Sequence, residues 1–175
     1  MSCNNQTHKV EDFTAEELIW HKPFAKVDTA IYSSDKGEKD TIIFDTPKAE
    51  SDSTRNVEQG FYNTNHLTVA YEFSKGSYHQ SAMMSDGKTR YNHWFVNSSK
   101  SSAGYGSVEI TFIGTFFSEK INNIQKVNDS TYYFDSSKAD YSGLNVEKGI
   151  KNFTFNTRLG VTEFVDDRNI KWTRQ

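Results

Sequence analysis

The sequence predicts an all-β protein, an antiparallel β-sandwich or a small β-barrel of about 8–10 strands with one short N-terminal helix. Leucine occurs at only four positions, whereas the 175-residue chain holds 13 phenylalanines and 9 tyrosines. Aromatic and β-branched side chains suit a pleated sheet, and large rings can fill a core that lacks leucine. Several segments also alternate apolar with polar residues, and turn-forming residues separate these segments.

The clearest alternation occurs twice in the middle of the chain. Leu67 to Phe73 places an apolar residue at every second position, and Val108 to Phe116 begins in the same way. This period puts one face of a strand on the core and the other near water. Both segments are therefore predicted to be central strands.

The N-terminal helix is predicted over Ala15 to His21. Thr14 and Glu17 have the spacing of a capping box, which begins a helix, and Pro23 prevents its continuation. We expect this helix to cover the sheet with inward side chains from Leu18 and from Ile19 or Trp20.

Two hairpins are predicted before residue 100. The first joins Val27–Ser33 to Thr41–Phe44 through the turn-like residues 35–38. The second spans Tyr78 to Val96 around Asp86-Gly87, a preferred pair for a two-residue turn. Among the residues that its register places on the face opposite the core, four combine an aromatic platform with hydrogen-bonding groups and form a candidate ligand-binding surface: His79, Arg90, Asn92 and Trp94. The alternative is a solvated or covered hairpin face without a ligand.

The C-terminal half continues the strand pattern. Lys126 to Phe134 is predicted as a hairpin around Asn128-Asp129, although Ile121, Ile124 and Val127 would also suit a helical turn. Three strands follow, at residues 150–156, 161–165 and 170–173. Residues 46–60 and 97–107 are polar or rich in small residues and are predicted to be loops.

Composition limits the function. The net charge is −3 and no lysine–arginine cluster is present, so we expect no nucleic-acid partner. No apolar run reaches the roughly 18 residues that a membrane-spanning helix needs. A single cysteine, Cys3, excludes an internal disulfide. We expect a flexible tether over residues 1–10 and one β-rich domain over residues 11–175.

Catalytic and metal-binding patterns are missing from the sequence. The five histidines show no ligand spacing, no nucleophile elbow occurs, and Asp166-Asp167 falls in a predicted turn where both carboxylates are expected to be solvated. The sequence therefore predicts no catalytic residue, metal or cofactor.

Two parts of the chain carry a resemblance to a known group of proteins. One is the N-terminal run Ser2-Cys3-Asn4-Asn5, and the other lies in the last 25 residues, with Phe153-Thr154-Phe155, Leu159 to Phe164 and Ile170-Lys171-Trp172. The first is similar to the lipidation site, and the second to the closing β-segment, of lipoproteins of unknown function from Bacteroidota, which the chain therefore resembles. The resemblance implies a β-rich fold and a cell envelope location with a lipid on Cys3. The chain has no acidic run after Cys3, which favours the periplasmic side over surface export; a cytoplasmic location is the alternative.

A short motif also resembles the O-glycosylation acceptor of exported Bacteroidota proteins. Asp followed by Ser or Thr and a small aliphatic residue or Thr occurs four times, which makes four side chains candidate acceptors: Thr29, Thr41, Ser53 and Ser130. Only exposed hydroxyls could carry a sugar.

These observations favour a non-enzymatic binding module of the cell envelope with a protein or glycan ligand. One alternative is an immunity-type protein that neutralises a toxin. A second is a glycan or cell-wall hydrolase, which needs two carboxylates about 5–10 Å apart in a cleft. A third is a carrier with an apolar cavity inside a closed barrel.

Overall fold

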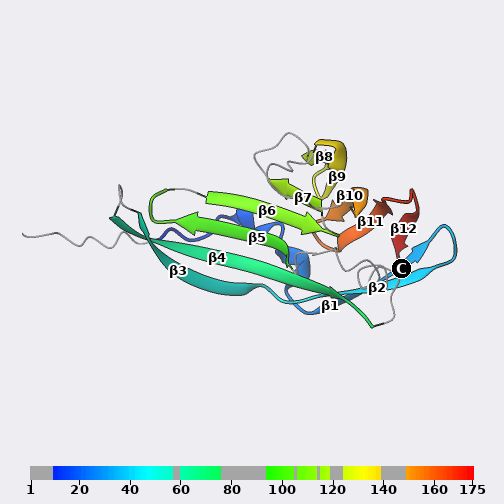
Figure 1. The fold of residues 1–175 in the computed structure, drawn as a ribbon, viewed down its shortest axis with the longest axis horizontal. Helices are drawn as coiled ribbons and strands as arrows, with labels where there is room; N and C mark the ends of the chain where they lie inside the picture. The colour runs from blue at the N-terminus through cyan, green and yellow to red at the C-terminus, as the bar shows by residue number, and fades with distance from the viewer. Residues whose placement is uncertain are drawn as a thin grey trace, which may run out of the picture.

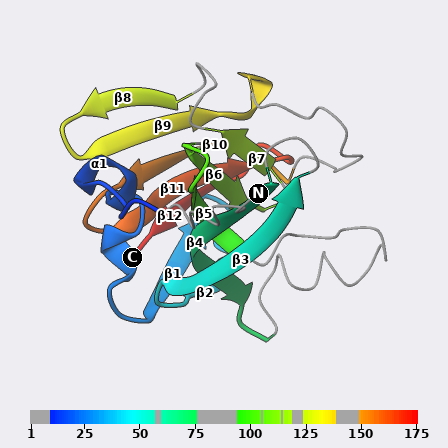
Figure 2. The ribbon, with the colours of Figure 1, turned by 90° about the vertical axis from the view of Figure 1, so that its left-hand side faces the viewer.

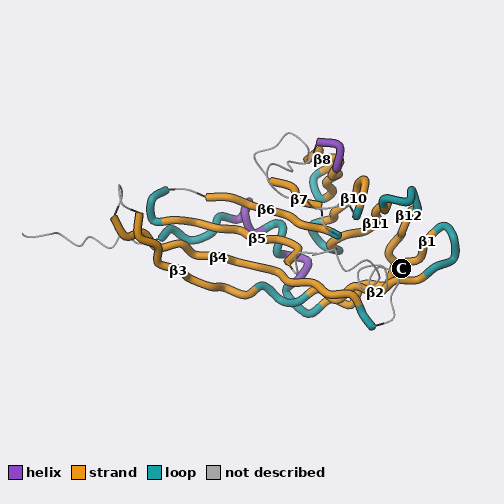
Figure 3. Tube along the Cα trace, in the orientation of Figure 1, coloured by secondary structure: helices purple, strands orange, loops and turns teal. Residues whose placement is uncertain are grey.

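Strands account for most of the chain that the computed structural model describes, which is residues 10–56, 60–75, 94–104, 106–113, 115–118, 124–138 and 149–175. Twelve strands belong to one sheet, and only short helical segments accompany them (Figure 3). The strands are β1 (Asp28–Ser34), β2 (Lys39–Phe44), β3 (Lys48–Asn56), β4 (Gly60–Phe73), β5 (Trp94–Ser101), β6 (Gly106–Phe112), β7 (Thr115–Ser118), β8 (Ile124–Asn128), β9 (Thr131–Asp135), β10 (Ile150–Asn156), β11 (Gly160–Asp166) and β12 (Lys171–Arg174). The helical segments are α1 (Ala15–Leu18), η1 (Lys22–Phe24) and η2 (Ser136–Lys138).

The sheet is antiparallel in every described pairing and follows the order β7-β6-β5-β4-β2-β1-β12-β11-β10-β9-β8, with β3 added to β4. The first and last strands of the domain, β1 and β12, therefore pair near the middle of the sheet. In Figure 1, β3 to β6 lie side by side and extend toward one end of the molecule, away from β10 to β12. The prediction of an antiparallel all-β fold with one short N-terminal helix is confirmed.

The sheet curls into a half-barrel, as the view along its long strands shows (Figure 2). Its order begins at β7 and ends at β8, and none of the pairings between described strands joins these two edges. The two halves instead meet through side chains: the ring of Phe117 on β7 lies 5.3 Å from that of Phe134 on β9 and 5.4 Å from that of Phe153 on β10. Ring packing thus holds the curl where no pairing between described strands joins the two edges.

Aromatic side chains fill the space enclosed by the curl, as the composition predicts. Phe134 and Phe153 stack at 4.2 Å and 7°, and Phe164 stacks on Trp172 at 5.8 Å and 9°. Leu18 and Leu159 are exposed, so these two leucines contribute nothing to this interior. The largest fully buried side chains are Trp172, Tyr32, Phe24, Phe44, Phe95, Phe112, Phe117, Phe134, Phe153, Phe155, Phe164 and Ile42.

The N-terminal strap, residues 10–24, covers the inner face of the sheet. The predicted capping box is present, because the Glu17 amide donates to Thr14 Oγ1 and the Thr14 amide donates to Glu17 Oε2. The ring of Trp20 packs on Tyr132, Phe134 and Phe155, and that of Phe24 packs on Phe44, Phe95 and Phe155. The strap thereby bridges the two halves of the curl.

The helix differs from its prediction in length and orientation. It ends at Leu18 rather than His21, and Pro23 lies in the 3-10 turn η1 that follows. Leu18, predicted to face inward, is exposed, while Trp20 is buried as expected. A helix of four residues has no room for an apolar stripe, so the strap is anchored by the residues after the helix.

Both predicted loops are wrong over most of their length. Residues 48–56 form β3, and residues 97–101 continue β5 before β6 begins at Gly106. Neither segment has an apolar period. β3 is held by its pairing along β4, and β5 lies between β4 and β6, so backbone hydrogen bonds to neighbours stabilise strands that side-chain patterning does not reveal.

Other predictions agree with the structure or differ in detail. The first hairpin has its turn at residues 35–38, as predicted. The hairpin of β8 and β9 is present in place of the helical alternative. The bounds of β10 to β12 agree with the predicted strands within one residue. The strand predicted to run to Phe116 instead ends at Phe112 and turns back, since Phe112 pairs with Thr115. The hairpin predicted over Tyr78–Val96 lies outside the described residues before Trp94.

Candidate functional site

Trp94, the described member of the predicted ligand-binding surface, is the first residue of β5. It is half-buried and lies opposite Ala70 of β4. Val69 and Tyr71, on either side of Ala70, are buried in the core, so Ala70 and Trp94 belong to the outer face of the sheet. This agrees with the predicted face of Trp94. The other three members, His79, Arg90 and Asn92, lie outside the described residues, as does Cys3.

The four candidate glycosylation residues differ in exposure. Thr29 on β1 and Ser53 on β3 are exposed, whereas Thr41 on β2 and Ser130 in the β8–β9 turn are half-buried. Thr29 and Ser53 are therefore the two sites whose hydroxyls meet the exposure requirement most fully.

The sheet is interrupted beside Trp94. β2 and β3 pair one after the other with the same edge of β4, β2 with residues 71–73 and β3 with residues 60–68. Between them, residues 45–47 leave the strand conformation. Pro47 has no N–H to donate to a ladder, which explains why the interruption falls there. β2 and β3 are thus two halves of one broken strand.

The opposite edge of β4 is irregular at the same level. Val69 pairs with Val96 and Ala70 pairs with Trp94, so Phe95 is an extra residue in β5. Such a bulge bends a strand and redirects its side chains. Here it turns Phe95 and Val96 both into the core, where both are fully buried, and leaves Trp94 on the outer face.

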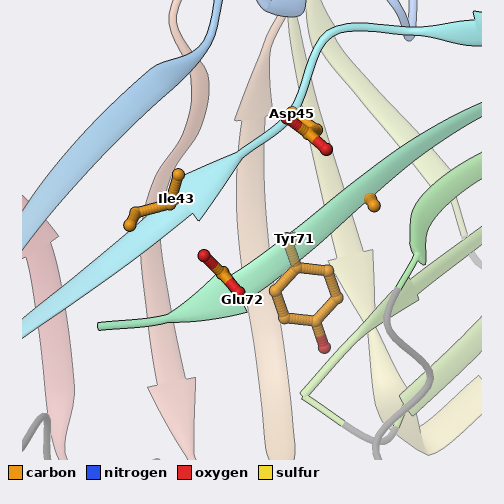
Figure 4. A pocket seen from close by; sticks show the side chains of 5 residues that line it. Ile43, Asp45, Tyr71 and Glu72 are labelled. Atoms are coloured by element: carbon orange, nitrogen blue, oxygen red, sulfur yellow. The ribbon is translucent and has the colours of Figure 1, made fainter. Parts of the chain in front are cut away.

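A hollow of about 320 Å³ lies where the two irregularities meet. Its described lining consists of Ile43, Asp45, Ala70, Tyr71 and Glu72, and Figure 4 shows Asp45 just after β2 and Glu72 on β4. The Tyr71 hydroxyl is on the inner side, where it accepts a hydrogen bond from the Ile113 amide at 3.0 Å. The groups that a ligand would meet are therefore Ile43, Ala70 and the two carboxylates.

The register relates the two carboxylates to each other. Ile43 pairs with Glu72, and the Asp45 amide donates to the Ala70 carbonyl at 2.9 Å. Asp45 and Glu72 are thus diagonal neighbours on one face, a relation with a Cβ separation of roughly 7 Å. The Lys48 ammonium already contacts Asp45 at 2.8 Å, and this hydrogen bond raises the pKa of Lys48. Asp45 is therefore already paired with the ammonium of Lys48, and Glu72, the second carboxylate of the hollow, is exposed to solvent.

An apolar row crosses the hollow on the outer face. Thr29 pairs with Ile43, so Ile31 is a diagonal neighbour of Ile43, and Ala70 is a diagonal neighbour of Ile43 on the other side. Ala70 in turn pairs with Trp94. Diagonal and direct partners are within reach of long and aromatic side chains. We call Ile31, Ile43, Ala70 and Trp94 the outer row; Ile31 at its end is 46% exposed.

Asp166 was predicted from the sequence to be solvated, and this prediction is wrong. It is fully buried, and its carboxylate accepts hydrogen bonds from the Trp172 indole at 3.1 Å and from the Arg168 guanidinium at 2.8 Å. Burial opposes ionisation, but these donors and the Ile170 amide lower the pKa of Asp166 below its usual value. Asp166 thus fixes the β11–β12 turn; Asp167 is exposed as predicted.

Asp45, Glu72 and Ile43 were not predicted as site residues from the sequence. Pro47 just after an apolar strand was the available signal for a break, but the partners across that break follow only from the register of β2, β4 and β5. Among the described residues, no group of three or more His, Cys, Asp or Glu is placed to hold a metal ion. No described helix has the length and apolarity to cross a bilayer.

Comparison with protein family models, curated proteins and solved structures finds no match to this chain.

Proposed function

We propose that the protein is a non-enzymatic binding module of the cell envelope that holds its ligand against the outer row. The observation that carries this proposal is the hollow beside Trp94, where a broken strand and a bulge open the sheet surface between apolar side chains. Its volume is at the low end of the range for ligand sites, which suits one sugar ring or one side chain of a partner.

The inner face is less suited to a ligand. Stacked rings fill the space inside the curl, and the N-terminal strap covers it. A carrier needs an apolar cavity there, so the geometry favours the outer face over a carrier function.

The location in the envelope rests on the resemblance at Cys3, with a lipid anchor on the periplasmic side. Expression of the native gene with radiolabelled palmitate should label the wild-type protein and not a Cys3→Ala variant. Equal labelling of the two, or none in the wild type, would remove the anchor from the proposal.

The binding function is tested by titrating a panel of soluble oligosaccharides and short peptides into the isotope-labelled protein and following its NMR spectrum. We expect at least one probe to shift the signals of the outer row, and Trp94→Ala to abolish the shift. Leu159→Ala is the matched control, because Leu159 is an exposed apolar residue, 57% exposed, in the β10–β11 turn. A panel without any outer-row response, or one in which Trp94→Ala has no effect, would overturn the proposal.

A second candidate function is glycan hydrolysis, and the pair of carboxylates in the hollow favours it. Carboxyl groups on diagonal neighbours can reach the separation of about 5–10 Å that glycosidases use for an acid and a second carboxylate. Hydrolysis of the oligosaccharide panel, lost in both Asp45→Asn and Glu72→Gln, would support an enzyme; binding without turnover supports the binding module.

A further inference from the structure

We infer that the hollow takes a cationic side chain, arginine or lysine, from a protein partner. This inference rests on the proposed binding function and names the chemistry of the ligand. Three properties of the hollow lead to it: its apolar wall, its two carboxylates and the ammonium that one carboxylate already holds.

The wall of the hollow matches the stem of such a side chain. Ile43 and Ala70 are both half-buried and both point outward, so they offer a short apolar surface without filling it. Lysine and arginine bury their methylene stems on such surfaces while the charged head stays near water. A stem against Ile43 and Ala70 would put its head between Asp45 and Glu72.

The carboxylates match the head. Asp45 lies just after β2 and Glu72 lies on the neighbouring strand β4, and their oxygens accept hydrogen bonds only. Two carboxylates side by side on a surface repel each other, and a cation between them removes that repulsion. Trp94 lies opposite Ala70, on the same outer face of the sheet as this hollow.

Lys48 shows that the site accepts a cation. Its ammonium lies 2.8 Å from Asp45, three residues away in sequence, with the two side chains 64% and 42% exposed. An ion pair this exposed contributes little to stability and exchanges readily. Lys48 therefore competes with the partner's cation, which gives a prediction that a sugar ligand does not share.

A protein partner also agrees with the rest of the outer row. Ile31 is 46% exposed at one end and Trp94 lies at the other, so a chain laid across β1, β2, β4 and β5 would meet apolar side chains on both sides of the cationic anchor. Tryptophan and isolated pockets of this kind are where interfaces concentrate their binding energy.

The test uses two capped tripeptides, acetyl-Leu-Arg-Leu-amide and its citrulline counterpart, which has the same shape and no charge. Trp20 and Trp172 are buried, so the indole N–H signal of Trp94 is the reporter on the outer face. The arginine peptide should shift this signal, with the citrulline peptide bound about fivefold more weakly, the effect of one partly exposed ion pair. Raising the salt concentration should weaken the arginine peptide alone.

Three variants complete the test. Glu72→Gln should lower the affinity for the arginine peptide about fivefold, and Lys48→Gln should raise it about twofold by removing the competing ammonium. Glu163→Gln is the matched control, since Glu163 on β11 is a partly exposed carboxylate paired with Lys171, and it should change nothing.

The outcomes are distinguishable. Equal binding of the two peptides, or no effect of Glu72→Gln, overturns the cationic ligand; if an oligosaccharide still binds at Trp94, the proposed binding function stands. An arginine peptide that leaves the Trp94 signal unmoved at millimolar concentration also overturns the inference.

Discussion

The burial of His21 makes the stability of the protein depend on pH in a way that can be measured. His21 lies in the N-terminal strap, is 4% exposed, and contacts Ser98 Oγ through Nε2 at 2.8 Å. Its Nδ1 has no hydrogen-bond partner among the described groups. Because burial penalises the charged imidazolium, the pKa of His21 falls from 6.5 to about 4.

The direction of the effect follows from proton binding. The folded state keeps His21 neutral down to a pH of about 4, whereas the unfolded state protonates it below pH 6.5. The unfolded state therefore gains protons first, and stability is lost as the pH falls from 6.5 toward 4. Each unit of pKa difference corresponds to about 1.4 kcal/mol, so the loss reaches about 2 kcal/mol at pH 5 and about 3 kcal/mol at pH 4.

Urea denaturation at pH 7, 5 and 4, followed by circular dichroism, measures this loss. His21→Gln keeps a polar side chain that does not titrate, so the wild type should lose about 3 kcal/mol more than this variant between pH 7 and pH 4. Titration of the carboxylates is common to both proteins and cancels. His66→Gln is the control, because His66 lies on the outer face and this variant keeps His21. It should therefore show the same loss of stability between pH 7 and pH 4 as the wild type. If wild type and His21→Gln show the same pH dependence, the strap does not bury His21 as described.

Three further predictions concern stability. Asp166→Asn should lower the free energy of unfolding by about 3 kcal/mol, because it leaves the Arg168 and Trp172 donors without a charged acceptor. Asp167 is exposed, so the control Asp167→Asn should change the free energy of unfolding by less than about 0.5 kcal/mol. Equal effects of the two substitutions would contradict the buried network. Gly160→Ala should lower the stability measured by thermal denaturation more than Gly37→Ala does. Both glycines have positive φ, so either substitution should destabilise the protein by about 1–2 kcal/mol, but only the methyl group added at position 160 would meet the Phe24 ring, at 3.2 Å. The reverse order of the two effects would contradict the position of η1 against Gly160. Phe153→Ala should lower the free energy of unfolding, measured by urea denaturation, by about 3–5 kcal/mol, because the Phe153 ring packs on Phe117 of one half of the curl and on Phe134 of the other. Leu159 is exposed, so the control Leu159→Ala should leave the free energy of unfolding nearly unchanged. A small loss for Phe153→Ala would contradict the claim that ring packing closes the curl.

Local patterns predicted the parts of the fold that local physics determines. The alternation at Val69, Tyr71 and Phe73 reports burial directly, and all three are buried. The capping box at Thr14 needs only neighbouring residues, as does the turn at Gly37, whose φ of +82° suits glycine. Such features do not depend on how distant strands pair, and for this reason they could be predicted from the sequence.

Long-range pairing determined the parts that were missed. Ser98 is buried because His21, 77 residues earlier, lies on it, and no local pattern indicates this contact. β3 is a strand because β4 offers it a partner, although residues 48–53 are all exposed. Of the candidate site, only Trp94 and its face were predicted among the described residues, since the hollow exists only when β2, β4 and β5 are placed in register.

A crystal structure of the protein with its tightest-binding probe tests the central claim most directly. We predict electron density for the probe on the outer face, in contact with Ile43 and Glu72 and beside Trp94. Density for the probe on the inner face, beneath a displaced N-terminal strap, would contradict the claim that the outer row is the binding surface.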